Sequence, residues 1–126
     1  MSRAARGLLG LWAMQRIEAT FALERLDELM NAVLALGVAC HMTASEVRFA
    51  DGRVRHDSQY RGVRYESRWE MRARLEVVVA DREAKAVVDL LATRLDDDRK
   101  RDEALIITEV DDALRIRTAR RGEIAF

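Results

Sequence analysis

The order in which hydrophobic residues change their spacing constrains the fold of this chain more than any other feature. Alternation of apolar and polar residues is typical of a half-buried strand, and an apolar period near 3.6 is typical of a helix. In chain order, the segments with these patterns are strand-like 15–22, helical 23–36, strand-like 42–50 and 71–80, helical 82–95 and strand-like 104–110. We therefore expect the element order β-α-β-β-α-β, with a further extended piece at 113–118.

Residues suited to the ends of helices and strands support these boundaries. Gly37 follows the first helical stretch, where a residue that tolerates positive φ can close a helix. Asp81 precedes the second helical pattern and is a candidate N-cap. Asp51 and Gly52 form a turn dipeptide after the second strand-like segment.

An antiparallel sheet with both helices packed on one face accommodates this order. The predicted fold class is therefore α+β, in the ferredoxin-like βαββαβ arrangement. At 126 residues the chain fits one domain, and self-association would help it to bury surface. We assign residues 14–126 to that single domain and treat 1–13 as an N-terminal extension outside the fold. No apolar run reaches the ~18 residues that a membrane span needs, so we expect no direct membrane insertion.

Charge and residue usage argue against several classes of function. The formal net charge is zero, which gives no support for nucleic-acid binding. The histidines are His41 and His56 and the single cysteine is Cys40, and no catalytic or metal-ligand set forms around them. The strand-like segment 71–80 lacks the stacking aromatics of an RNA-recognition module. We therefore expect no catalysis, no metal site and no nucleic-acid partner.

Residues 53–70 are dense in charged and aromatic side chains and lack a core period, which indicates an exposed excursion between two strands. From Arg48 to Arg74 the chain holds eight arginines against four acids. Two interpretations stay open: a solvated loop of mixed charge, or an arm that docks a partner or binds an anion. In the second interpretation the contact anchors are Tyr60, Tyr65 and Trp69.

Three motifs follow one another in a fixed order along the chain. They are MTASEV at 42–47, YRGVRY at 60–65, and LRIRT at 114–118 followed by RGE at 121–123. They resemble the MTVTEV, YRGAEY and IRIRTGERGE segments of the nitrogen regulatory protein P-II family, the PII signal-transduction proteins. The resemblance extends over residues 14–122.

This resemblance implies a cytoplasmic homotrimer that regulates a partner protein. PII proteins hold nucleotides in the clefts between subunits. The match implies an adenine pocket at Thr43, Glu76 and Val78, and phosphate contacts from Arg115 and Arg117. The excursion then corresponds to the family's effector loop, the T-loop, whose residues here include Arg53, Tyr60, Arg61, Tyr65 and Arg72.

The chain departs from the family at its phosphate-binding loop. The TGxxGDGK segment corresponds to residues 97–104, which lack glycine and carry Ala104 at the lysine position. Between Asp96 and Glu103, five acids stand against three bases, and a net negative loop opposes a triphosphate. Arg53 replaces a glutamine that helps the family to bind magnesium and 2-oxoglutarate, and a guanidinium offers a metal no oxygen. The sequence therefore disfavours ATP and a magnesium–2-oxoglutarate complex.

These observations lead to the hypothesis of a PII-like regulator that senses an adenine nucleotide, ADP or AMP, or a small anion in an altered way. It would control a partner protein, a membrane transporter or an enzyme, through its arginine-rich loop. The alternative is a trimeric adaptor of the same fold that has lost small-molecule binding.

Overall fold

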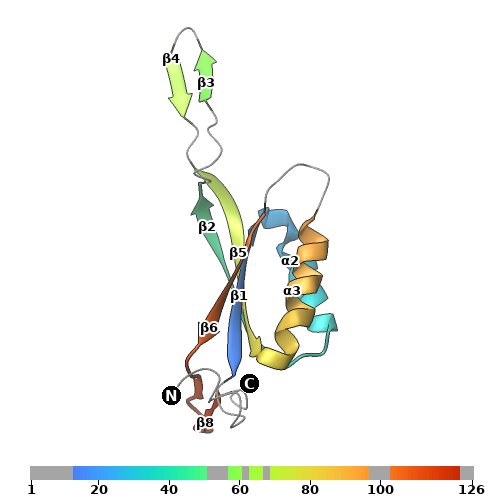
Figure 1. The fold of residues 1–126 in the computed structure, drawn as a ribbon. Coiled ribbons are helices and arrows are strands. Elements are labelled where there is room, and N and C mark those ends of the chain that lie inside the picture. Colours follow the sequence, from blue (N-terminus) through green and yellow to red (C-terminus); the bar gives the residue numbers. More distant parts are fainter. Residues whose placement is uncertain (1–12, 51–56, 61–62, 67–68, 97–102, 123–126) are drawn as a thin grey trace.

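A four-stranded antiparallel sheet with the strand order β2-β5-β1-β6 forms the centre of the protein. The computed structural model describes residues 13–50, 57–60, 63–66, 69–96 and 103–122, and describes only the main chain at 57–60 and 63–66. The strands of the central sheet are β1 (Met14–Phe21), β2 (Cys40–Phe49), β5 (Glu70–Ala80) and β6 (Leu105–Val110). The helices α2 (Leu26–Ala35) and α3 (Asp81–Leu95) cover one face (Figure 1). The predicted ferredoxin-like α+β fold is confirmed.

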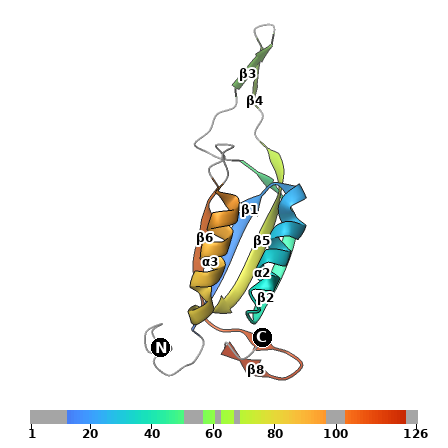
Figure 2. The same cartoon turned by 90° about the vertical axis from the view of Figure 1, so that its right-hand side faces the viewer.

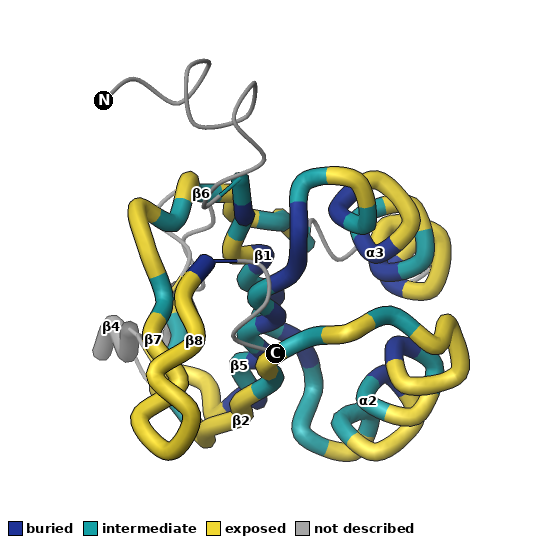
Figure 3. Tube along the Cα trace, turned by 90° about the horizontal axis from the view of Figure 1, so that it is seen from below, coloured by how far each residue is buried: buried dark blue, intermediate teal, exposed yellow. Residues whose placement is uncertain are grey.

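The hydrophobic core lies between the helices and the sheet. Ile17, Ala19 and Phe21 of β1 are fully buried, as the alternation predicts. They pack with Ala73, Leu75, Val77 and Val79 of β5 and with Leu29, Val33, Ala84, Val87, Leu91 and Leu95 of the helices. Figure 3 shows the buried parts of both helices turned toward the strands. Because each large buried apolar side chain contributes about 1.5–3 kcal/mol, this layer is the main source of stability.

The first helical stretch divides into two elements and ends at a glycine. A 3-10 turn, η1 (Leu23–Arg25), leads into α2, which ends at Ala35. Gly37 then has a φ of 71°, and its N–H donates to the carbonyl of Leu34 at 3.1 Å. The predicted helix-closing role of Gly37 is confirmed.

The prediction that Asp81 caps α3 is wrong. The helix begins at Asp81 itself, and Ala80 occupies the N-cap position without a side-chain hydrogen bond. Strand β5 therefore runs into α3 with no residue between them. The Asp81 N–H donates to the carbonyl of Ala13 at 2.8 Å, one residue before β1 begins. Its carboxylate still stands in the first helical turn, where the helix dipole favours negative charge.

A second, smaller sheet lies within the predicted excursion. The strands β3 (Asp57–Tyr60) and β4 (Val63–Glu66) pair antiparallel, with Asp57 opposite Glu66. Figures 1 and 2 show this hairpin beyond the end of the central sheet at which β2 ends and β5 begins. The two strands lie away from the core, as expected for an exposed excursion (Figure 1). The sequence did not predict the strands themselves, because residues 53–70 lack the apolar periodicity of a core element.

A third sheet, of two strands, replaces the extended piece expected at 113–118. Strand β7 (Leu114–Arg115) pairs with β8 (Arg120–Arg121), and residues 116–119 form the turn between them. The turn closes through a hydrogen bond from the Ala119 N–H to the Arg115 carbonyl at 2.8 Å. The expectation of continuous extended structure was therefore wrong, because this contact folds the chain back after two residues.

Candidate functional site

The face of the sheet that the helices leave uncovered holds the three residues of the predicted base pocket. Thr43 on β2 lies directly opposite Glu76 on β5. Val78 follows two residues later on β5, so its side chain shares that face. Thr43 is exposed, and Glu76 and Val78 are partly exposed. Their side chains therefore share one accessible surface.

The Glu76 carboxylate has one weak ionic neighbour on the same strand. Arg74 Nε lies 3.9 Å from Glu76 Oε1, and both side chains are partly exposed. An ion pair of this length and exposure contributes little, about 0–1 kcal/mol. The carboxylate of Glu76 can therefore accept hydrogen bonds from a ligand without the loss of a strong internal contact.

The predicted phosphate contacts lie on the β7–β8 hairpin. Arg115 is in β7 and Arg117 is in the turn, and both are exposed. Arg115 lies directly opposite Arg120 of β8. Like charges at directly opposed positions destabilise a strand pair, and an anion between them would remove that cost. Sequence reasoning missed Arg120 because it gave this segment no turn.

Arg121 ties the same hairpin to the chain that precedes it. Its Nε lies 3.3 Å from Asp112 Oδ2. The Asp112 Oδ1 also accepts a hydrogen bond from the Ala113 N–H at 2.8 Å, and the Gly122 N–H donates to the Ala113 carbonyl at 3.0 Å. These contacts hold the base of the hairpin, so that Arg115 and Arg117 extend from a fixed support.

The residues assigned to the effector loop have different positions. Arg53 and Arg61 lie outside the described residues. Tyr60 is the last residue of β3 and Tyr65 is in β4, where only the main chain is described. Arg72 is the third residue of β5 and is only 9% exposed. Arg72 is therefore part of the central sheet.

Glu103, which is described at the end of the altered phosphate loop, and the β7–β8 hairpin lie beyond opposite ends of β6. Residues 97–102 of the altered phosphate loop lie outside the described part of the chain. Glu103, which follows them, contacts Arg72 near the start of β5. The β7–β8 hairpin instead follows Val110, at the far end of β6 (Figure 1). The six residues of β6 separate Glu103 from the hairpin by roughly 20 Å, so one small ligand cannot contact both Glu103 and the hairpin within one chain.

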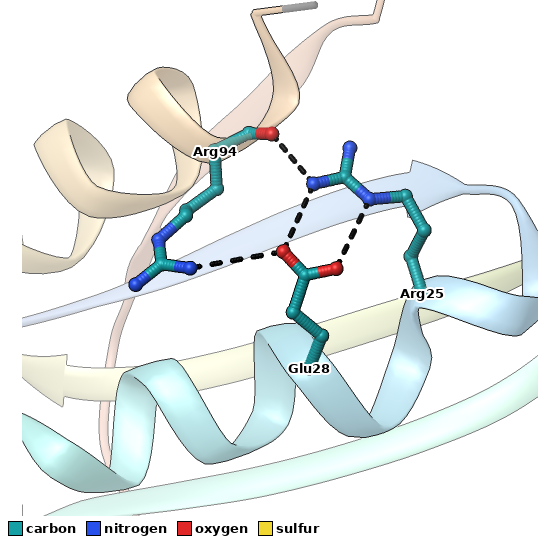
Figure 4. A network of polar contacts seen from close by, with 3 residues as sticks. All are labelled: Arg25, Glu28 and Arg94. Carbon is teal, nitrogen blue, oxygen red and sulfur yellow. Dashed lines mark hydrogen bonds and ion pairs between the residues drawn. The ribbon is translucent and has the colours of Figure 1, made fainter.

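A polar network joins the ends of the two helices (Figure 4). Arg25 Nη2 donates to Glu28 Oε1 at 3.2 Å and to the Arg94 carbonyl at 2.7 Å. Arg94 Nη1 lies 3.7 Å from the same Glu28 oxygen. The hydrogen bond and charge of Arg25, with the weaker charge effect of Arg94, lower the pKa of Glu28 below its ordinary value. The network fastens the last turn of α3 to the start of α2.

Two further observations concern the described part of the chain alone. No group of three His, Cys, Asp or Glu side chains there is placed to hold a metal ion. No helix in those same ranges has both the length and the apolar character to span a membrane.

Comparison with protein sequences gives a family match over most of the chain. Residues 14–120 match the profile of the family described as Nitrogen regulatory protein P-II. The chain is 33% identical over 112 residues to the nitrogen regulatory protein P-II of Cereibacter sphaeroides, covering 89% of this chain and 99% of that protein. It is 33% identical over 113 residues to nitrogen regulatory protein P-II 2 of Methanothermobacter thermautotrophicus, covering 89% and 96%.

Comparison with solved structures gives the same fold. B. subtilis GlnK superposes with a TM-score of 0.70 at 18% identity, covering 90% of this chain and 98% of that one. Arabidopsis thaliana PII bound to citrate superposes with a TM-score of 0.70 at 22% identity, covering 90% and 92%. Together, the family profile, the curated relatives and the shared fold show that the chain belongs to the nitrogen regulatory protein P-II family.

Proposed function

We propose that this PII-family regulator is a homotrimer that binds ADP, AMP or a small anion and controls a partner protein through the segment that carries β3 and β4. The observation that carries the proposal is the exposure of Arg115 and Arg117 on a braced hairpin. Figure 3 shows β7 and β8 on the side of the sheet away from the helices. The register and burial pattern of β2 and β5 place Thr43, Glu76 and Val78 on that uncovered face as well. A base on the open face and an anionic group at the hairpin are therefore compatible.

The proposal favours ADP, AMP or a small anion over ATP because the altered loop has more acids than bases. Its net negative charge would repel a triphosphate. One solved structure of B. subtilis GlnK is a complex with ATP, and the A. thaliana PII structure is bound to citrate. These structural neighbours support an adenine nucleotide or a carboxylate anion as the kind of ligand to test. The partner in this proposal is a cytoplasmic enzyme or a membrane transporter, and the protein itself catalyses nothing.

Exposed apolar side chains support the homotrimer. Ile106 and Ile107 on β6, an edge strand of the described sheet, are 54% and 48% exposed, and Leu114 and Ile116 beyond it are 52% and 93% exposed. A strand edge with exposed apolar side chains is a surface that a further copy can cover. Light scattering after size exclusion should give three times the chain mass of 14.4 kDa. A monomeric mass would contradict this part of the proposal.

A thermal-shift measurement tests ligand binding. Purified protein is heated with ADP, AMP, ATP, bicarbonate, citrate or 2-oxoglutarate, each with and without magnesium. A ligand at a hundred times its Kd stabilises the native state by about 2.7 kcal/mol. We expect a shift with ADP or AMP, or with a small anion, and its loss in R115A/R117A. The control R82A/K85A removes two positive charges from the exposed side of α3 and should keep the shift.

Two other results would change the conclusion. A strong magnesium-dependent shift with ATP would contradict the interpretation of residues 97–104 as a weakened phosphate loop. No shift with any ligand, in a protein that is still trimeric, would favour the alternative of an adaptor without small-molecule binding. Glu103 favours that alternative, because this acid of the altered loop is only 10% exposed and is already paired with Arg72.

A further inference from the structure

One buried guanidinium, that of Arg72, contacts residues from three separate places in the chain. Its Nη1 donates to Glu103 Oε2 at 3.2 Å, and its Nη2 donates to Glu70 Oε2 at 3.2 Å. Its central carbon lies 4.1 Å from the centroid of the Phe49 ring. Such a stack places the positive charge over the negative face of the ring. We call these four residues the Arg72 cluster.

The members of the Arg72 cluster stand at the ends of two chain connections. Phe49 is the last residue of β2 and Glu70 is the first residue of β5, and the two lie directly opposite each other. The connection between them carries the β3–β4 hairpin. Glu103 lies at the end of the other connection, from α3 to β6, two residues before Leu105. Arg72 therefore contacts the two residues at which the β2–β5 connection leaves and rejoins the sheet, and also the end of the α3–β6 connection.

Burial makes the contact between Arg72 and Glu103 the central one. Their side chains are 11% and 10% exposed, whereas that of Glu70 is 51% exposed and can be hydrated. The buried Nε of Arg72 finds no acceptor among the described residues. If Glu103 moved away, Nη1 would also lose its acceptor in a place that water reaches poorly. A buried charge that loses its partner is strongly destabilised, so the cluster is expected to open as a unit.

We propose that Arg72 is a positioning residue that couples the α3–β6 connection to the base of the β3–β4 hairpin. Displacement of Glu103 frees Arg72 and loosens the last β2–β5 pairs, Val47 with Arg72 and Phe49 with Glu70, from which the hairpin extends. A partner that holds the hairpin acts on Glu103 by the same route, because coupling between two sites is reciprocal. The proposal requires no ligand and stands whether or not the proposed function holds.

Hydrogen exchange of the full-length protein in its native oligomeric state tests this coupling. The E103Q variant keeps the side-chain volume but removes the charge next to Arg72. We expect exchange at the main-chain amides of residues 47–49 and 70–72 to rise by about tenfold, beyond any rise at Ala19 and Val77 in the middle of the sheet. The matched control E28Q removes a carboxylate that also contacts two arginines, but in the helix network. It should leave residues 47–49 and 70–72 within about twofold of the unchanged protein.

A second variant approaches the cluster from the other connection. F49L removes the ring under the guanidinium while an apolar side chain remains. Reciprocal coupling requires faster exchange at the amides of Leu105 and Ile106, which lie on the far side of Arg72 from the substitution. The F49L experiment also tests the coupling if E103Q does not fold. The proposal is overturned if F49L leaves Leu105 and Ile106 unchanged, or if E103Q and E28Q accelerate residues 47–49 and 70–72 equally.

Discussion

Arg25 donates a hydrogen bond from Nη2 to the main-chain carbonyl of Arg94, at 2.7 Å and across 69 residues of sequence. This contact joins the start of α2 to the last turn of α3, where the helix carbonyls lack internal partners. The same nitrogen also contacts Glu28, so one guanidinium links the Glu28 carboxylate to the Arg94 carbonyl.

Truncation of Arg25 should therefore destabilise the protein. We expect R25A to lower the free energy of unfolding by about 1 kcal/mol, measured by urea denaturation. R25K should recover only part of this loss, because an ammonium lacks the planar fork that reaches both partners. R82A removes an arginine that is 67% exposed on α3 and should have almost no effect. Equal losses in R25A and R82A would show that the contact with Arg94 contributes nothing to stability.

The lowered pKa of Glu28 predicts how stability depends on pH. A carboxyl group whose pKa is lower in the folded state stabilises the fold above its ordinary pKa of 4.5, and this contribution disappears as the pH falls through the folded value. The unchanged protein should therefore be more stable than E28Q near neutral pH, and the difference should narrow below about pH 4.5. Urea midpoints from about pH 6 to about pH 3 measure it. A difference that stays constant over this range would contradict the prediction.

Ala119 has a φ of 57°, in the left-handed region that a side chain disfavours. A119G should relieve this strain and stabilise the β7–β8 hairpin by up to about 1 kcal/mol. The measurement is slower hydrogen exchange at the amide of residue 119, which donates to the Arg115 carbonyl. Faster exchange in A119G would show that the added freedom of the open turn outweighs the strain.

Gly37 provides the matched opposite case. Its φ is 71°, and an added Cβ there would meet no atom within 4 Å. The cost of G37A therefore comes from the main chain alone, and we expect a loss of about 1 kcal/mol in the free energy of unfolding. A neutral G37A would show that the end of α2 can adopt another conformation without cost.

The cross-strand pair of Arg115 and Arg120 predicts opposite effects on hairpin stability and on anion binding. R120E replaces a like-charge pair by an opposite-charge pair, which should stabilise the hairpin by about 0.2–1 kcal/mol. The same change removes positive charge from the proposed anion site, so affinity for ADP or inorganic phosphate should fall about tenfold. Hydrogen exchange at Gly122 and calorimetric titration measure the two effects.

R82E is the matched control for this charge reversal, since it makes the same change on the exposed surface of α3. It should alter neither the exchange at Gly122 nor the affinity for the anion. Unchanged affinity in R120E would remove Arg120 from the anion site while it leaves Arg115 and Arg117 to be tested by their own double variant.

The buried faces of the strands and helices could be predicted, because burial in a two-layer core repeats at regular spacings along the chain. The alternation of Ile17, Ala19 and Phe21 identified the buried face of β1, and Gly37 identified the end of the first helical stretch. The turn at 116–119 was not predictable in the same way. Its left-handed residue is an alanine, which gives none of the signal that a glycine would give.

In the candidate site, too, some features were predictable from the sequence and others were not. Resemblance to the P-II family selected Thr43, Glu76 and Val78, and the register of β2 and β5 places them on one face. The contact between Arg72 and Glu103 could not be predicted, because the two residues are 31 apart in sequence and no spacing rule connects them. Contacts of this kind depend on the path of the whole chain, so they appear only in three dimensions.

The direct passage from Ala80 in β5 to Asp81 in α3 has a consequence for how this chain can change in length. One inserted or deleted residue here would rotate the apolar stripe of α3 by about 100° around its axis relative to the sheet. Such a rotation would turn Val87 and Leu91, both fully buried, toward water. Residues around this junction can be substituted without that rotation. An insertion or deletion there would disrupt the packing of α3 on the sheet.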